Sequence, residues 1–238
     1  MGLDSGSGNP SFPVSVLSAL SVVKNPDLCR LCLADACESA GTSQRRAFVH
    51  CRDCGLVFVP EAYWVTVDEE RARYAHHDNV ASNEGYVKFL GQVADVVEGR
   101  VGPGGRVLDF GSGENQVLAG LLRKRARTCN AYDPLYGIGP DVLREKYDAI
   151  VLCEVIEHLH ELRAELARLA ECLRPGGSIV VRTQCYPSVA EVPSWWYARD
   201  ATHINFFARR TLELAAALWG LRCQPTREPD IVVWSSDK

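Results

Sequence analysis

The sequence predicts an α/β fold, a doubly wound and mostly parallel sheet that follows a small cysteine-rich module. The first observation is the stretch VLDFGSGENQVLAGLL at 107–122, which reads as an apolar strand, a glycine turn and a helix. The second is the alternation of strand and amphipathic helix patterns over 84–183, which is typical of βαβ units. The third is a pair of Cys-x2-Cys motifs within 29–54. A chain of 238 residues is long enough for both parts.

Composition and charge limit the classes of function. With 47% hydrophobic and 24% charged residues, the chain has the composition of a soluble globular protein. The formal net charge of -4 argues against an affinity for nucleic acid along the whole chain. The sequence shows neither an uncharged apolar run of roughly 18–20 residues nor a signal-peptide pattern, so we expect a cytoplasmic protein without a membrane span.

The chain divides into four segments. Residues 1–23 begin with a Gly/Ser-rich stretch, and we expect a disordered tail there. The cysteine-rich module follows at 24–60, and 61–83 form a linker or lid segment. Residues 84–238 form the main domain, which begins with a helix from Glu84.

Four of the ten cysteines are spaced as ligands of one metal ion. Two Cys-x2-Cys turns chelate a single zinc ion in many small modules, and short strand patterns flank the second pair here, as in a zinc ribbon. Four thiolates close the coordination shell, so the predicted zinc is structural. The alternative is four ordinary buried cysteines. The predicted ligands are Cys29, Cys32, Cys51 and Cys54.

The glycine turn lies at the carboxyl end of a buried strand, where open α/β sheets bind ligands. Gly111 and Gly113 allow the backbone to turn sharply and to approach a ligand closely. The next strand ends in Asp133, whose carboxylate can accept hydrogen bonds from both ribose hydroxyls of an adenosine. The acid that precedes the glycines, Asp109, suits a cofactor that presents an ammonium group rather than a pyrophosphate.

Four motifs together resemble the class I S-adenosylmethionine-dependent methyltransferases: VLDFGSGEN, AYDP, YDAIVLCEVIEHL and LRPGGSIVVRT. The resemblance covers about 84–235 and implies a Rossmann-like fold that binds S-adenosylmethionine. The family pattern carries a further glycine where this chain has Asn115. The cofactor residues that the resemblance implies are Asp109, Gly111, Ser112, Gly113, Asp133, Pro134, Leu135 and Glu154.

The segment 134–147 is too short for the helix, strand and helix that the family places there. We therefore expect the sheet to lack one edge strand, and with it the usual acidic contact to the adenine amino group. We predict that Leu135 and Tyr136 cover the adenine face instead. Further along, 221–226 and 230–235 read as the antiparallel hairpin that closes such a sheet.

The loop 184–207 is rich in aromatic residues and leaves the end of a central strand, where a substrate lid belongs. The alternative is a satellite hydrophobic cluster, which Phe206 and Phe207 favour most. The segment before Glu84 can also fold over the ligands. The predicted substrate-binding residues are Trp195, Trp196, Tyr197, Asp200, His77, Asn79 and Tyr86.

Methyl transfer requires an aligned nucleophile and, for many acceptors, removal of a proton. His158 and His203 are the candidate bases, because histidine titrates near neutral pH. Structural roles are the alternative for both. Glu157 is a third candidate that orients His158 or binds substrate, with solvated surface as its alternative.

The sequence thus favours a methyltransferase that acts on a small molecule and leaves carbon, oxygen and nitrogen open as the acceptor atom. One alternative is an RNA or protein methyltransferase that docks through the ribbon, although 24–60 contain only five basic residues against four acidic ones. Another is a scaffold that binds the cofactor without catalysis. The oligomeric state stays open.

Overall fold

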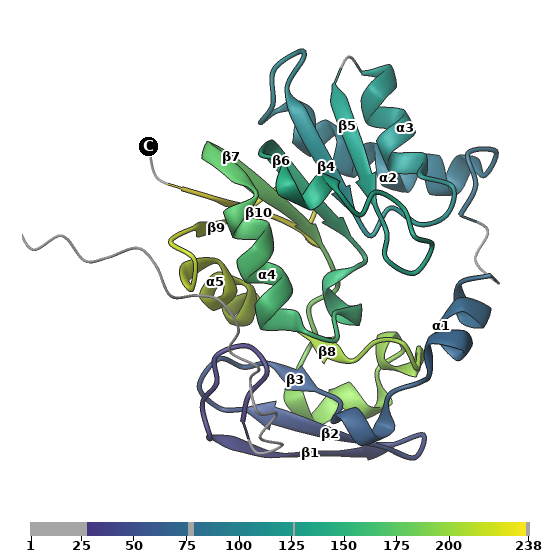
Figure 1. The fold of residues 1–238 in the computed structure, drawn as a ribbon. Helices are drawn as coiled ribbons and strands as arrows, with labels where there is room; N and C mark the ends of the chain where they lie inside the picture. Colours follow the sequence, from purple (N-terminus) through teal and green to yellow (C-terminus); the bar gives the residue numbers. More distant parts are fainter. Residues whose placement is uncertain (1–27, 76–78, 126, 237–238) are drawn as a thin grey trace, which may run out of the picture.

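A six-stranded sheet forms the larger layer of the molecule (Figure 1). The computed structural model describes residues 28–75, 79–125 and 127–236. The strand order is β5-β4-β6-β7-β10-β9, with β4, β5, β6 and β7 parallel and β10 antiparallel to both of its neighbours. The strands are β4 (Arg106–Phe110), β5 (Thr128–Tyr132), β6 (Tyr147–Cys153), β7 (Leu173–Arg182), β9 (Arg222–Pro225) and β10 (Ile231–Ser235).

This topology confirms the predicted fold class, including the closing hairpin. Strand β5 is the edge of the sheet, and only the short 3-10 helix η2 (Val142–Arg144) stands between β5 and β6. The expected edge strand is therefore absent from the described sheet. Because β5 simply takes the edge position, the core beneath β4 and β6 stays closed.

Helices cover both faces of the sheet. Alternate residues of each strand point to opposite faces. Val107 and Val151 pack against α2 and α3, whereas Leu108 and Leu152 pack against α4 and α5. Helix α2 begins after its N-cap Asn83, whose side chain accepts the Tyr86 N–H. The helices are α2 (Glu84–Glu98), α3 (Val117–Lys124), α4 (Leu162–Glu171) and α5 (Arg209–Ala217).

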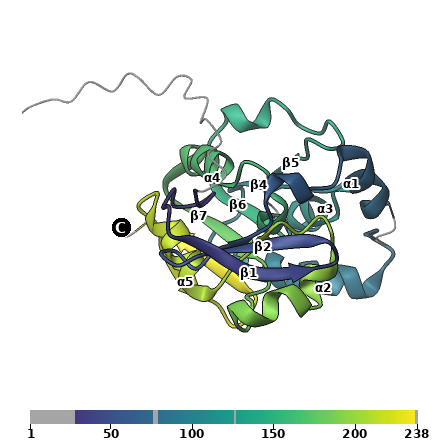
Figure 2. The same cartoon turned by 90° about the horizontal axis from the view of Figure 1, so that it is seen from below.

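A second, four-stranded sheet contains the predicted ribbon strands and one strand from the main domain. Its order is β1-β2-β3-β8. Strand β8 comes from the end of the aromatic loop, and it pairs with β3 through Val57 opposite Phe206. Figure 2 shows the long β1–β2 hairpin from below. The ribbon and the aromatic loop thus share one sheet, whose strands are β1 (Cys37–Ser43), β2 (Arg46–Cys51), β3 (Val57–Phe58) and β8 (Asn205–Phe206).

The linker contains a helix that the sequence analysis did not predict. Helix α1 (Val67–Tyr74) begins with a capping box in which Thr66 and Glu69 satisfy each other's backbone N–H groups. The pattern T-x-x-E was the available indication of this helix. Four further 3-10 helices are η1 (Glu61–Tyr63), η3 (Ile156–His158), η4 (Val189–Ser194) and η5 (Tyr197–Arg199).

Two other expectations concern the N-terminal tail and a membrane span. The predicted disordered tail at 1–23 lies outside the described residues. Within the described ranges, no helix has the length and apolar character needed to cross a bilayer.

Candidate functional site

A cavity of about 1410 Å3 opens at the carboxyl ends of β4, β5 and β6. The glycine turn, the segment after β5, the exit of β6, helix α1 and the aromatic loop all contribute to its wall. The cavity therefore lies where the sequence analysis placed the cofactor and the substrate.

The glycine turn packs directly on the exit of β6. Gly111 has a φ of 76°, and a Cβ atom built there would lie 2.5 Å from Val155 Cγ2. Only glycine satisfies both the left-handed backbone and the close approach. This contact brings the turn after β4 against the segment that carries Glu154 and Glu157.

Asp133 ties the ends of β4 and β5 together. Its Oδ2 accepts the Gly113 N–H at 2.9 Å, and its Oδ1 accepts the Leu135 N–H at 3.0 Å. Burial raises the pKa of the Asp133 carboxyl, while these hydrogen bonds act in the opposite direction. The carboxylate lines the cavity and keeps further acceptor positions for a ligand.

The other predicted cofactor residues separate into two groups. Gly111, Ser112, Gly113, Pro134, Leu135 and Glu154 line the cavity with Asp133. Asp109 is not among the described residues that line it: its carboxylate is 2% exposed and accepts the Ala119 N–H at 3.1 Å. Burial raises the pKa of Asp109 to about 7. Asn115, where the family pattern has glycine, also lines the cavity and donates to the Asn79 carbonyl at 3.1 Å.

All three predicted catalytic residues meet on the other side of the cavity. The rings of His158 and His203 pack edge to face with centroids 4.7 Å apart, and both line the cavity. Glu157 lies behind them, with its Oε1 4.0 Å from His158 Nε2. Its side chain is 0% exposed, so the alternative of solvated surface for Glu157 is wrong. Burial lowers the pKa of His203 to about 4.

A tyrosine links the two glutamates of this region. The Tyr197 hydroxyl lies within hydrogen-bond distance of Glu157 Oε1 and at 3.1 Å from Glu154 Oε2. Thr183 donates to the other oxygen of Glu157 at 3.0 Å. Burial raises the pKa of both carboxyls, and the Glu154 charge raises that of Glu157 further.

The predicted substrate residues differ in position. Trp196, Tyr197, Asp200, Asn79 and Tyr86 line the cavity, and Trp196 is 61% exposed. Trp195 is not part of the described lining and packs on Phe206 in a separate hydrophobic cluster. His77 lies outside the described residues. The alternative of a satellite cluster thus describes Trp195 and Phe206, whereas Phe207 packs in the main core with α4 and α5.

Helix α1 connects both halves of the cavity. Arg71 donates to the Leu135 carbonyl at 3.0 Å, next to the predicted adenine site. Arg73 forms an ion pair with Asp200 at 2.9 Å, and the Tyr74 hydroxyl lies 3.0 Å from His158 Nδ1. The sequence analysis expected this segment to fold over the ligands but singled out neither arginine.

The ribbon holds the aromatic loop from outside the cavity. The Arg46 guanidinium is buried and donates to the Ala201 and His203 carbonyls at 3.1 Å and to the Asp200 carbonyl at 3.3 Å. A further hydrogen bond reaches the Ala198 carbonyl. Nothing in the sequence pattern around Arg46 indicated this role, because its partners lie more than 150 positions away.

The four predicted metal ligands lie together. The Sγ atoms of Cys29 and Cys54 are 3.5 Å apart, those of Cys32 and Cys51 are 3.6 Å apart, and all four lie within 4.8 Å of one another. The corners of a tetrahedron around zinc are separated by about 3.8 Å when each Zn–S bond is about 2.3 Å. The cysteine geometry therefore fits a closed tetrahedral zinc site.

Comparison with known proteins identifies the family. A family profile described as a methyltransferase domain matches residues 76–225, more than half of the chain. The chain belongs to this methyltransferase family. No curated protein matches the sequence significantly.

One solved structure shows the same fold at low sequence identity, and a second is also similar to this chain. An O-methyltransferase family protein from Burkholderia thailandensis is 17% identical with a TM-score of 0.52, and the match covers 79% of this chain and 66% of that one. The chain thus spans slightly less than two thirds of that relative. A didemethyltoxoflavin N1-methyltransferase from the same organism is 14% identical with a TM-score of 0.49, and the match covers 84% of this chain and 100% of that one.

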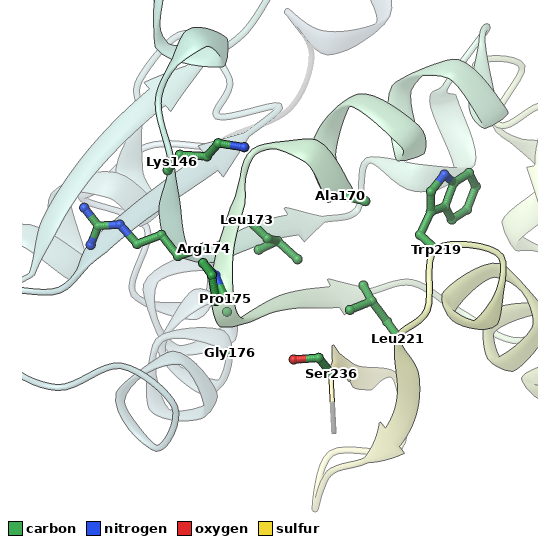
Figure 3. A pocket seen from close by; sticks show the side chains of 10 residues that line it. Lys146, Ala170, Leu173, Arg174, Pro175, Gly176, Trp219, Leu221 and Ser236 are labelled. Atoms are coloured by element: carbon green, nitrogen blue, oxygen red, sulfur yellow. The ribbon is translucent and has the colours of Figure 1, made fainter. Parts of the chain in front are cut away.

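A second, smaller hollow lies at the opposite end of the methyltransferase sheet (Figure 3). It measures about 430 Å3, and its cations are already engaged: Arg174 binds the Asp148 carboxylate at 2.9 Å, and Lys146 donates to the Glu171 carbonyl. Parallel sheets bind ligands at the carboxyl ends of their strands, so the larger cavity is the candidate active site of this methyltransferase.

Proposed function

We propose that the protein transfers a methyl group from S-adenosylmethionine to a small-molecule acceptor within the 1410 Å3 cavity. The observation that carries this proposal is the arrangement of the cavity. The glycine turn and Asp133 line the cavity together with His158 and His203. A donor and an acceptor bound there would lie side by side.

The cofactor half follows from the residues around β4 and β5. Asp133 accepts the ribose hydroxyls, and the turn at Gly111 and Gly113 admits the cofactor backbone closely. Leu135 and Tyr136, which line the cavity, cover the adenine face in place of the absent edge strand. Glu154, at the end of β6, lies near the sulfonium and the acceptor.

The histidine pair assists the chemistry at the acceptor. The acceptor atom forms a bond to the methyl carbon while the bond between that carbon and sulfur breaks, and the electron pair stays on sulfur. The acceptor loses its proton to an imidazole of the pair His158 and His203. The products are the methylated acceptor and S-adenosylhomocysteine.

The four cysteines hold a structural zinc ion in this proposal, and the zinc organises the ribbon. Strand β3 and Arg46 of the ribbon then position the aromatic loop. Three of the five basic residues of 24–60 are engaged within the described part of the chain: Arg30 donates to Asn205 Oδ1 at 3.0 Å, Arg46 donates to the loop carbonyls, and Arg52 pairs with Glu38 at 3.8 Å. This favours a small-molecule acceptor over docking of RNA through the ribbon.

The first test is calorimetric titration of the zinc-replete protein with S-adenosylmethionine and S-adenosylhomocysteine. We expect binding that Asp133→Ala weakens by about 100-fold, since hydrogen bonds to a charged group contribute about 1.5–3 kcal/mol each. Asp141→Ala is the matched control, because Asp141 is 81% exposed and pairs only with Arg144 among the described ion pairs. Equal binding by both variants, or no binding at all, would overturn the proposed cofactor site.

A further inference from the structure

Three ligand-type groups converge on one point of the acceptor wall. Glu157 and His158 come from η3, and His203 comes from the loop before β8. One ligand atom from each residue lies within 4.8 Å of those of the other two. Ligand atoms on opposite sides of one transition-metal ion are about 4.2 Å apart, because each bond is about 2.1 Å. Small side-chain movements would therefore place all three on one ion.

The backbone orients both histidines for coordination. His203 Nδ1 lies 2.8 Å from the Tyr197 carbonyl, and His158 Nδ1 lies 3.1 Å from the Thr202 carbonyl. A carbonyl oxygen only accepts, so His203 Nδ1 carries a hydrogen, and the lone pair of its neutral ring is on Nε2. Metal-binding histidines are held in the same manner, by donation from the nitrogen that does not bind the metal. His158 Nδ1 is held between the Thr202 carbonyl and the Tyr74 hydroxyl, which leaves its Nε2 on the side of Glu157.

The charge of this region also suits a cation. Glu157 is fully buried, and Glu154 has an Oε1 atom that is buried without a hydrogen-bond partner in the described part of the chain. The described ion pairs join neither carboxylate to a lysine or arginine within 4.0 Å; Glu157 has His158 there. Two buried carboxyls of this kind either hold a proton, as their raised pKa values favour, or ionise beside a positive charge such as a bound cation; the Arg182 charge favours the ionised form of Glu154.

We propose that Glu157, His158 and His203 bind a divalent transition-metal ion that holds a hydroxyl group of the acceptor. A set of two imidazoles and one carboxylate suits ions such as Mn2+, Fe2+, Co2+ or Zn2+. His158 and His203 line the cavity while Glu157 lies behind them, so the open coordination positions face the acceptor. This inference rests on the proposed function and narrows its acceptor to a hydroxyl compound.

The ion would supply the activation that the proposed function assigns to the histidine pair. A metal-bound hydroxyl loses its proton more readily than a free one. The proton passes to Glu154, whose Oε1 is unpaired in the described residues, and the oxygen then bonds to the methyl carbon as the carbon–sulfur bond breaks. The products are a methyl ether, S-adenosylhomocysteine and a proton released from Glu154.

The test uses Mn2+ itself. Mn2+ binds thiolate ligands weakly, so it leaves the zinc in the cysteine site. Mn2+ is titrated into the zinc-replete protein with S-adenosylhomocysteine, and free Mn2+ is followed by electron paramagnetic resonance. We expect about one Mn2+ bound per chain. His203→Ala and Glu157→Gln should weaken Mn2+ binding by more than about tenfold.

His50→Ala is the matched control, because His50 pairs with Glu38 on the ribbon hairpin, away from the cavity. Retained binding of S-adenosylhomocysteine shows that each variant is folded and that the cofactor site is intact. Absence of Mn2+ binding in protein that binds S-adenosylhomocysteine would overturn the metal site and leave a histidine base. Failure to bind S-adenosylhomocysteine would instead refute the proposed function.

Discussion

The two halves of the cavity are built in different ways. Apart from Glu154 at the end of β6, the proposed cofactor half comes from one continuous stretch, 107–136, whose turns are tied by local hydrogen bonds such as those of Asp133. The acceptor half is assembled from helix α1, η3 and the aromatic loop, and the ribbon holds that loop from outside. The difference indicates that the cofactor half depends on its own turns, whereas the acceptor half depends on a distant module.

Cys51→Ser should have the largest effect. Cys51 is fully buried in the cysteine quartet, and structural zinc sites contribute on the order of 10 kcal/mol to the folding of small modules. We expect loss of bound zinc and a fall in turnover of more than about 100-fold, because the loop loses its support. Elemental analysis measures the zinc content, and calorimetry with S-adenosylmethionine measures separately whether the cofactor half is intact.

Cys37→Ser is the control for this experiment. Cys37 lies beside the quartet, but its Sγ contacts the Ala34 carbonyl at 3.9 Å and is not part of the four-thiolate group. The Cys37→Ser protein should therefore keep its zinc. If Cys51→Ser weakened S-adenosylmethionine binding as much as turnover, the two halves would not be separable.

Gly111→Ala tests whether the cofactor half depends on the close contact of its own glycine turn. An alanine with φ near 76° is strained by about 1–2 kcal/mol, and overpacking against Val155 adds about 1–3 kcal/mol. Gly104→Ala is a close control: its φ is also 76°, and a Cβ there meets nothing within 4 Å. Urea unfolding and cofactor titration should show the larger loss at Gly111. Equal losses would mean that the contact with Val155 is unimportant.

The sequence allowed the fold around the proposed cofactor half to be predicted because its information is local. Strand, turn and acid follow one another in VLDFGSG and AYDP, and the missing edge strand followed from the length of 134–147. The three catalytic candidates were also recognised as residues, yet their convergence depends on the β3–β8 pairing. The role of Arg46 could not be predicted from the sequence, because its partners are main-chain carbonyls, which every residue type has. Trp195 looked like its neighbour Trp196, and only tertiary packing separates them.

Arg46→Met should reduce turnover by about 10- to 100-fold and leave cofactor affinity unchanged. The substitution removes the donors to the Asp200, Ala201 and His203 carbonyls, and each unsatisfied buried carbonyl costs about 1–3 kcal/mol. The loop that carries His203 would then lose its position. Turnover and cofactor titration are compared with Arg52→Met, whose side chain is 65% exposed. A parallel loss of cofactor affinity would contradict the separation of the halves.

The double variant Leu135→Ala, Tyr136→Ala sharpens the comparison from the cofactor side and should have the smallest effect. Both side chains are half-buried and line the cavity, and the Leu135 carbonyl is held by Arg71. Removing the two apolar surfaces should weaken S-adenosylmethionine binding by about tenfold, since full burial of one such side chain contributes about 1.5–3 kcal/mol. Mn2+ binding should not change, because its ligands lie on the acceptor wall. Tyr63→Ala, at an exposed position on η1, is the control. Near-native cofactor affinity in the double variant would show that other residues cover the adenine.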